Sequence, residues 1–199
     1  MELPNHNSAV AYALKRLGEL PQNYFYHSLA HTCEIVVPAI ERFAESEGVY
    51  ETDLHILRIG AFFHDIGFVR QYQDHEAVSI EIAQDVLPGF GYNPSQIHTI
   101  SGIIIATRLP QSPKTHLEKI MADADMDILG RDDFWEFNQY LRAERAAFGY
   151  PVGDLQWYQG QLKFMGSHQY FTKSAIHLRE KGKQQNMDKL KMKIDKELQ

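Results

Sequence analysis

The sequence contains a single cysteine, Cys33, among its 199 residues. One cysteine cannot form an intrachain disulfide, and it cannot supply a metal site built from several thiolates. Ten histidines and 26 acidic residues are present instead. Any metal ion held by this chain must therefore be bound by imidazole and carboxylate groups.

Long apolar stretches are also missing. No segment approaches the roughly 18 apolar residues of a membrane span. The first twenty residues, MELPNHNSAVAYALKRLGEL, lack the basic start and the apolar run of a signal peptide. We therefore expect no contact with a membrane and a cytoplasmic location.

Positive charge is scarce except near the C-terminus. The net charge is -6, and residues 179–199 carry seven Lys or Arg against four acidic residues, which leaves about nine negative charges in excess on residues 1–178. Because nucleic acid backbones attract basic faces, we expect no nucleic acid polymer as a partner. We interpret the basic end as a solvated terminal helix rather than as a site for an anionic partner.

Apolar residues recur at spacings of three and four along most of the chain, which predicts an all-α fold. The expected helices lie near residues 6–18, 28–46, 52–66, 75–87, 94–108, 113–129, 132–147 and 154–181. Asn93-Pro94 and Ser112-Pro113 each place a capping side chain before a proline at a first helical position. With 44% hydrophobic residues and no linker, we expect one helical bundle of about seven to nine helices over 1–181. A charged helix or tail should follow over 182–199, and the chain should fold alone or as a simple homo-oligomer.

The stretch AFFHDIGF, residues 61–68, places His64 and Asp65 inside an apolar run. His64 follows earlier apolar residues at helical spacing, so it continues the buried face. Asp65 lies about 100° further round the helix, so both side chains reach one ion only at a junction of helices. Gly60, one turn earlier, would let a second helix come close there. For the pair alone, a core histidine hydrogen-bonded to a neighbour is the alternative.

The stretch YFYHSLAHTCEIV, residues 24–36, holds two histidines four residues apart, His27 and His31. This spacing puts both on one helical face. Neutral imidazole is a common metal ligand. The alternatives are that either residue caps the helix, stacks on Tyr24 or Tyr26, or is exposed.

The stretch KIMADADMDILG, residues 119–130, offers three acidic residues that helical phase separates. Asp125 shares a face with apolar neighbours and should point inward, whereas Asp123 and Asp127 should lie on a solvated face. A buried carboxylate bonded to the backbone or to an arginine is the alternative for Asp125.

In order along the chain, the motifs YHxxxH, FFHDIG and DAD resemble the signature of the HD superfamily of metal-dependent phosphohydrolases over residues 24–130. The resemblance implies a set of ligands for a divalent metal, namely His31, His64, Asp65 and Asp125. His27 resembles the histidine that protonates the leaving group in the cyclic-nucleotide phosphodiesterase branch.

The resemblance leaves the roles of several other residues open. His75, which opens the next expected helix, is either a further ligand, a base that orients water, or outside the site. His98 would complete a two-metal set, but its phase puts it off the apolar face. Phe68 stands where some relatives have a phosphate-binding lysine. Three basic residues are candidates for neutralising phosphate, with surface solvation as the alternative, namely Arg70, Arg108 and Lys114.

Two imidazoles and two carboxylates suit Mn, Fe, Ni, Co, Zn or, less well, Mg, as one ion or two. The implied reaction is hydrolysis of a nucleotide or other small phosphoester by a phosphomonoesterase or phosphodiesterase. Asp65 would both bind the ion and orient the nucleophile. One alternative is a di-iron oxygenase, which needs both His75 and His98. The other is a non-catalytic metal- or nucleotide-binding signalling module.

Overall fold

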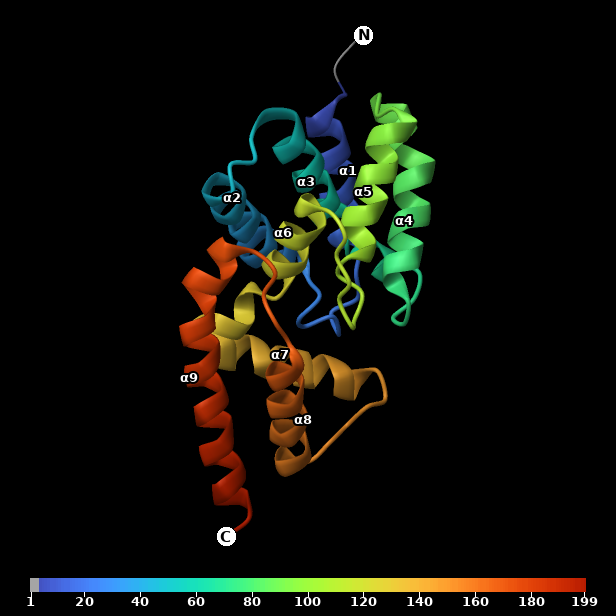
Figure 1. The fold of residues 1–199 in the computed structure, drawn as a ribbon. Helices are drawn as coiled ribbons and strands as arrows, with labels where there is room; N and C mark the ends of the chain where they lie inside the picture. The colour runs from blue at the N-terminus through green and yellow to red at the C-terminus, as the bar shows by residue number, and fades with distance from the viewer. Residues whose placement is uncertain (1–3) are drawn as a thin grey trace.

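The computed structural model describes residues 4–199 (Figure 1). Over that range the chain is helical and contains no strand, so the all-α class is confirmed. The described residues form nine α-helices, within the expected number: α1 His6–Leu17, α2 Val37–Ser46, α3 Glu51–Phe63, α4 His75–Val86, α5 Pro94–Ile105, α6 His116–Asp125, α7 Phe134–Ala147, α8 Asp154–Ser167 and α9 Lys173–Glu197. A π-helix and three 3₁₀ turns lie between them: His31–Val36, Ile66–Val69, Leu87–Phe90 and Asp127–Gly130.

The helices form two parts that meet near the middle of the molecule. α1 to α6 occupy the upper part of Figure 1, and α7, α8 and most of α9 the lower part. Each part has its own apolar cluster, and the side chain of Met126 packs against both. Within the upper part, a Cβ atom on Gly60 would lie 2.3 Å from Cγ2 of Ile103, closer than carbon atoms can pack. The glycine thus lets α3 and α5 touch, as expected.

The sequence predicted two helix starts from a capping residue followed by proline, at Asn93-Pro94 and at Ser112-Pro113. The first of these is correct. The Asn93 side chain accepts a hydrogen bond from the backbone of Gln96, which makes a capping box at the start of α5. The predicted start at Ser112-Pro113 is wrong. α6 begins at His116, where Thr115 and Glu118 form the capping box instead.

The single helix expected over 154–181 is two helices, α8 and α9, separated at 168–172. The break is held by Asp123, which is fully buried. Its carboxylate accepts hydrogen bonds from the backbone N–H groups of Phe171 and Thr172 and from the Thr172 hydroxyl, at 2.6–2.8 Å. The prediction that Asp123 is solvated is therefore wrong, because its partners come from a segment 48 residues away.

Asp127 is likewise buried, contrary to the solvated face expected for it. Its two oxygens accept hydrogen bonds from Arg179, at 2.6 and 3.0 Å, and one also accepts from Arg42 at 3.0 Å. Burial of a carboxylate is tolerable when charged donors satisfy it. This ion cluster ties α2 and α9 to the turn that follows α6.

The boundary drawn at residue 181 falls inside α9, which runs without a break to Glu197. Lys183, Asn186 and Leu190 are buried, so part of the expected solvated end is packed against its neighbours. The side-chain amide of Asn186 donates to the carbonyls of Leu129 and Arg131, at 3.1 and 3.0 Å. The division into a bundle and a tail stays a prediction.

None of the helices described over residues 4–199 combines the length and the apolar character that crossing a membrane requires.

Candidate metal centre

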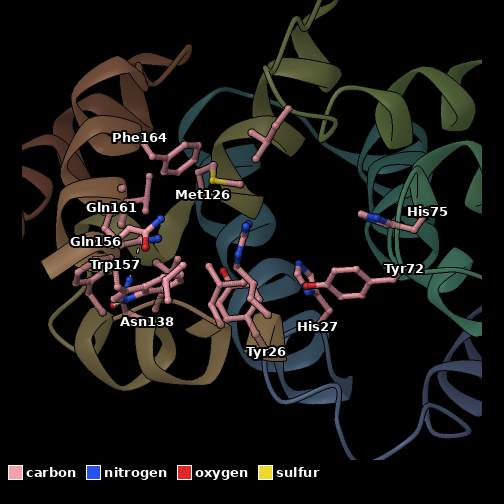
Figure 2. A pocket seen from close by; sticks show the side chains of 18 of the residues that line it. Tyr26, His27, Tyr72, His75, Met126, Asn138, Gln156, Trp157, Gln161 and Phe164 are labelled. Carbon is pink, nitrogen blue, oxygen red and sulfur yellow. Dashed lines mark hydrogen bonds between the residues drawn. The ribbon is translucent and has the colours of Figure 1, made fainter. Parts of the chain in front are cut away.

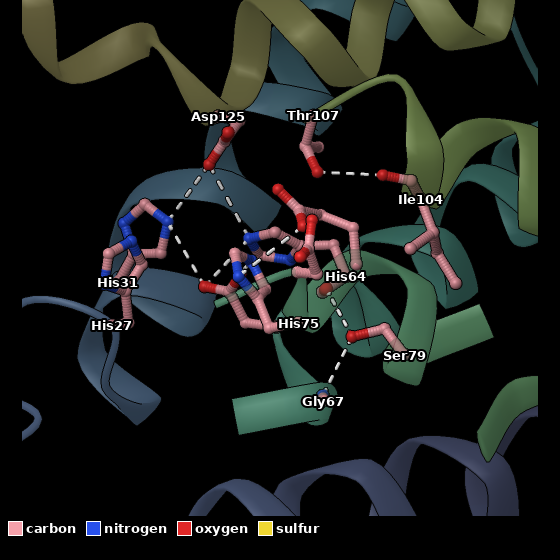
Figure 3. A network of polar contacts seen from close by, with 12 residues as sticks. His27, His31, His64, Gly67, His75, Ser79, Ile104, Thr107 and Asp125 are labelled. Carbon is pink, nitrogen blue, oxygen red and sulfur yellow. Dashed lines mark hydrogen bonds and ion pairs between the residues drawn. The ribbon is translucent and has the colours of Figure 1, made fainter. Parts of the chain in front are cut away.

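His31 is the first residue of the π-helix that precedes α2. Such wide turns insert an extra residue into a helix and are frequent at functional sites. The His31 side chain is 1% exposed. It lies beside the Tyr26 ring, with ring centroids 4.8 Å apart. Its Nε2 atom points into the polar network of Figure 3.

His64 and Asp65 follow the last turn of α3, at the junction with the 3₁₀ turn Ile66–Val69. The Nδ1 atom of His64 lies 2.6 Å from the carbonyl oxygen of Ala61. A carbonyl only accepts hydrogen bonds, so Nδ1 carries a proton, and Nε2 is the ring nitrogen that faces the network. A metal-binding histidine is commonly fixed in this way.

Gly67 and Ser79 hold the chain that follows this pair. The Ser79 hydroxyl donates to the carbonyl of His64 at 2.7 Å and accepts from the N–H of Gly67 at 2.8 Å. A Cβ atom on Gly67 would lie 2.0 Å from the carbonyl oxygen of His75. The glycine after the His-Asp pair is thus required for α4 to approach, which brings His75 to the site.

Asp125, the last residue of α6, meets both histidines. Its Oδ1 lies 3.2 Å from Nε2 of His31 and 3.6 Å from Nε2 of His64. Asp65 approaches the same two atoms, with its Oδ2 at 3.8 and 3.1 Å. His31, His64 and Asp65 form a compact group whose donor atoms all lie within 4.8 Å of one another, and Asp125 joins it through the two imidazoles.

Two of these separations, 3.1 and 3.2 Å, fit neighbouring ligands of one ion, and the other two, 3.6 and 3.8 Å, are wider. Donor atoms about 2.1 Å from a metal and about 90–110° apart are separated by about 3.0–3.4 Å. Nε2 of His64 and Oδ2 of Asp65 are buried and make no hydrogen bond within the described structure. Buried polar atoms without a partner are costly, and a cation at their junction would satisfy both. The four side chains therefore fit a divalent metal, and their role as its ligands stays a prediction.

The charges in the cluster are mutually stabilised. Burial alone would raise the pKa of Asp65 and of Asp125, but the neighbouring imidazoles outweigh it. The pKa of Asp65 falls well below its usual value, and that of Asp125 falls to about 2. Both carboxylates are thus ionised at neutral pH, as a metal site requires.

His75, at the start of α4, lies at the edge of this group. Its Nε2 is 3.3 Å from Oδ1 of Asp65, the oxygen that does not face His64. Its ring stacks on Phe68, with centroids 3.8 Å apart and an interplanar angle of 16°. Phe68, in the position of the lysine found in some relatives, thus supports His75 rather than a phosphate.

His27 lies four residues before His31, in a bend that precedes the helix, so the expectation that both histidines share one helical face is wrong. His27 is held by a residue that the sequence did not single out. Glu144, in the last turn of α7, has no exposed surface. One of its oxygens pairs with Nδ1 of His27, and the other accepts from the backbone N–H groups of Tyr26 and His27, at 2.8 and 2.9 Å. Burial lowers the pKa of His27, but the hydrogen bond to Glu144 and the nearby Asp65 outweigh it, so the pKa is raised.

The remaining candidates lie away from the cluster. His98 is exposed on α5, as its phase predicted. Arg70 and Arg108 pair at the surface with acidic residues, and Lys114 is exposed. Their exposure favours the alternative stated for these three cations, surface solvation, over phosphate binding.

A cavity of about 550 Å³ opens beside the cluster (Figure 2). His27 and His75 line it at one end, and residues of α7 and α8 line the other. This arrangement gives an organic molecule access to the edge of the candidate metal centre.

A buried group of two imidazoles and two carboxylates at a junction of helices, with a cavity beside it, defines a helical protein with a candidate divalent metal site. The HD domain family matches residues 5–126, more than half of the chain, and the chain therefore belongs to that family. HD domains bind divalent metals, and their superfamily consists mostly of metal-dependent phosphohydrolases. Neither the curated proteins nor the solved structures contain a match to the chain.

Proposed function

We propose that this protein is a metal-dependent hydrolase of small phosphoesters. The observation that carries the proposal is the convergence of four buried donor atoms, with imidazole-to-carboxylate separations of 3.1–3.8 Å. The donors are Nε2 of His31, Nε2 of His64, Oδ2 of Asp65 and Oδ1 of Asp125. Two imidazoles and two carboxylates balance the charge of a divalent cation of the Mn, Fe, Ni, Co, Zn or Mg group.

A bound ion would polarise a phosphoryl oxygen and lower the pKa of water. Side chains of the protein would orient the water and protonate the leaving group. The second oxygen of Asp65, Oδ1, lies 3.3 Å from Nε2 of His75, and His75 lines the cavity, so these two side chains can orient the nucleophilic water. His75 is thus assigned to positioning water, and ligation stays open.

His27 is the proposed general acid. It lines the cavity beside His75, with ring centroids 6.1 Å apart, so it can reach a group bound between them. Its bond to Glu144 fixes the ring and raises its pKa, which favours the protonated form. As water oxygen bonds to phosphorus and the ester P–O bond breaks, His27 gives its proton to the leaving oxygen.

The test compares two variants of helix α3 and the turn that ends it. Asp65→Asn removes one charged donor, so we expect it to abolish uptake of Mn or Ni at one equivalent and phosphoesterase activity with it. Asp53→Asn changes an exposed residue of the same helix and should leave both unchanged. Metal content is measured by elemental analysis, and activity with 4-nitrophenyl phosphate. Full metal uptake by Asp65→Asn would contradict the ligand assignment.

Two other functions can be distinguished from this one, the first by oxygen consumption and the second by metal content and esterase activity. The di-iron oxygenase needs His98, which lies exposed on α5. Oxygen consumption by the iron-loaded protein, lost in His98→Ala, would favour it. A non-catalytic module would take up metal through the same four residues and hydrolyse no ester.

A further inference from the structure

We propose that the substrate carries a single phosphate on an uncharged, largely apolar or aromatic organic group, which occupies the cavity between the metal centre and helices α7 and α8. This inference rests on the proposed function and adds the class of substrate. It follows from the composition of the walls, their charge and the place of the cavity.

The walls are predominantly apolar. Apart from the two histidines, the side of the cavity near the cluster is formed by Tyr26, Phe68 and Met126. The opposite side is formed by apolar residues of the turn after α6, of α7 and of α8: Ile128, Leu129, Phe134, Leu141, Trp157 and Phe164. A space of about 550 Å³ is within the range that encloses small organic ligands. Such a surface gains free energy by burying an apolar group and loses it by burying a charge.

Positive charge is nearly absent from these walls. Among the described residues that line the cavity, Arg145 is the only lysine or arginine. It is exposed, and its guanidinium lies over the Tyr150 ring, 5.7 Å from the centroid. One phosphate can bind at the metal centre and pair with His27, but for a second or third phosphate the only further lysine or arginine among these lining residues is the exposed Arg145. The cavity therefore disfavours nucleoside polyphosphates and other polyanions.

A small polar patch lies across the cavity from His27 and His75, where Figure 2 shows the amides of Asn138, Gln156 and Gln161. Asn138 is buried, and its amide accepts from the indole N–H of Trp157 and donates to Oε1 of Gln161, both at 2.8 Å. The amide nitrogen of Gln161 is left to donate. The organic group would then carry a neutral hydrogen-bond acceptor at the end remote from its phosphate.

Most of this wall lies beyond residue 126, where the match to the HD family ends. The apolar cavity is therefore a property of this chain's own C-terminal helices. The reaction itself is an ordinary hydrolysis: one water is consumed, its oxygen joins phosphorus, and the organic group leaves as an alcohol that takes the proton of His27. No oxidant or second substrate is required.

Binding is tested with phosphonates, whose P–C bond cannot be hydrolysed, on the Mn-loaded protein. We expect naphthylmethylphosphonate to bind roughly tenfold or more tightly than methylphosphonate, because the ring is buried. Methylenediphosphonate should compete poorly. Trp157 lines the cavity, so ligand binding can be followed by quenching of its fluorescence. Equal affinity for the two monophosphonates, or a preference for the diphosphonate, would overturn the inference.

Gly160 provides a variant that fills the cavity without disturbing the fold. It lines the cavity on α8, and no atom lies within 4 Å of a Cβ built there. Gly160→Leu should lower the preference for 1-naphthyl phosphate over ethyl phosphate, as a ratio of kcat/KM, by about tenfold. Gly166→Leu, on the same helix but outside this cavity, is the matched control and should leave the ratio unchanged.

The two proposals fail in different ways. If metal-loaded protein hydrolyses ethyl phosphate but shows no preference for apolar groups, the inference is wrong and the proposed function stands. If no ester is hydrolysed, the proposed function is wrong. The phosphonate measurement then still decides whether the cavity selects an apolar group with one phosphate.

Discussion

Glu144 is the residue whose position matters most for the proposed chemistry and whose role the sequence conceals. It is fully buried, and its carboxylate bonds to the ring of His27 and to the backbone of Tyr26 and His27. Burial alone would raise the pKa of this carboxyl, but the hydrogen bond and charge of His27 lower it. A buried ion pair of this kind positions an imidazole and sets the pH range in which it holds a proton.

Glu144→Gln keeps the shape of the side chain and removes its charge. We expect kcat to fall about a hundredfold, because the general acid loses both orientation and proton affinity. The pKa of His27 should fall, so the basic limb of the kcat profile should move to lower pH. Steady-state kinetics across pH measures both effects.

The control for this variant is Glu136→Gln, which changes an exposed residue on the same helix. It should alter neither kcat nor the profile. A uniform loss of activity in Glu144→Gln, with no displacement of the basic limb, would show that Glu144 is only structural.

The sequence predicted burial correctly for polar residues that lie on the apolar face of a helix. His64 and Asp125 are polar side chains at positions where helical phase predicts burial, and both are buried beside His31. Glu144 and Asp123 gave no such signal, because each lies among other charged residues. Their burial depends on contacts with segments 48 or more residues away, which periodicity within one helix does not report.

At the scale of elements, α9 passes the turn after α6 at unusually short range. A Cβ atom on Gly182 would lie 2.1 Å from the carbonyl oxygen of Gly130, and one on Gly130 would lie 2.3 Å from the carbonyl oxygen of Arg179. Both glycines are therefore required for the backbones to meet. The ion cluster around Asp127 lies at the same crossing.

Gly182→Ala should lower the free energy of unfolding by about 1–3 kcal/mol, because backbone atoms must move apart to accept the methyl group. Gly160→Ala makes the same change on α8, where the site is open, and should raise stability by about 0.5–1 kcal/mol. Urea denaturation followed by circular dichroism measures both. Similar stability of the two variants would contradict the close crossing.

Element boundaries were less predictable than element type. Most helices lie where apolar periodicity placed them, since that pattern reflects which face is buried. The break between α8 and α9 was missed because Asp123 caps the backbone of 171–172 from another helix. The start of α6 was missed because the Thr115 capping box, rather than Ser112-Pro113, satisfies its first N–H groups.

At the scale of the whole molecule, His168 links stability to pH. It lies between α8 and α9, packs edge-on against the Tyr170 ring, and has two ring nitrogens without a hydrogen-bond partner in the described structure. Burial and the nearby charge of Lys183 lower its pKa to about 4, although Asp125 opposes this. The folded state thus binds fewer protons at His168 than the unfolded state does between about pH 4 and 6.5.

Because the unfolded state takes up the proton first, stability should fall as the pH drops through this range, by up to about 1.4 kcal/mol per pH unit from this residue. His168→Gln should reduce that dependence, whereas His177→Gln, on the exposed side of α9, should not. Urea denaturation between pH 4.5 and 7.5 tests this. An unchanged pH dependence in His168→Gln would show that the residue is protonated equally in both states.

The contact between Glu144 and His27 has a consequence for how the chain can be divided. The donor atoms of the candidate metal centre all lie within residues 5–126, but the group that anchors the proposed acid comes from α7. Residues up to 126 could thus gather an ion and yet leave His27 unsupported. Under the proposed function, capture of metal and turnover of substrate therefore require different lengths of the polypeptide, since the second also needs α7 in place.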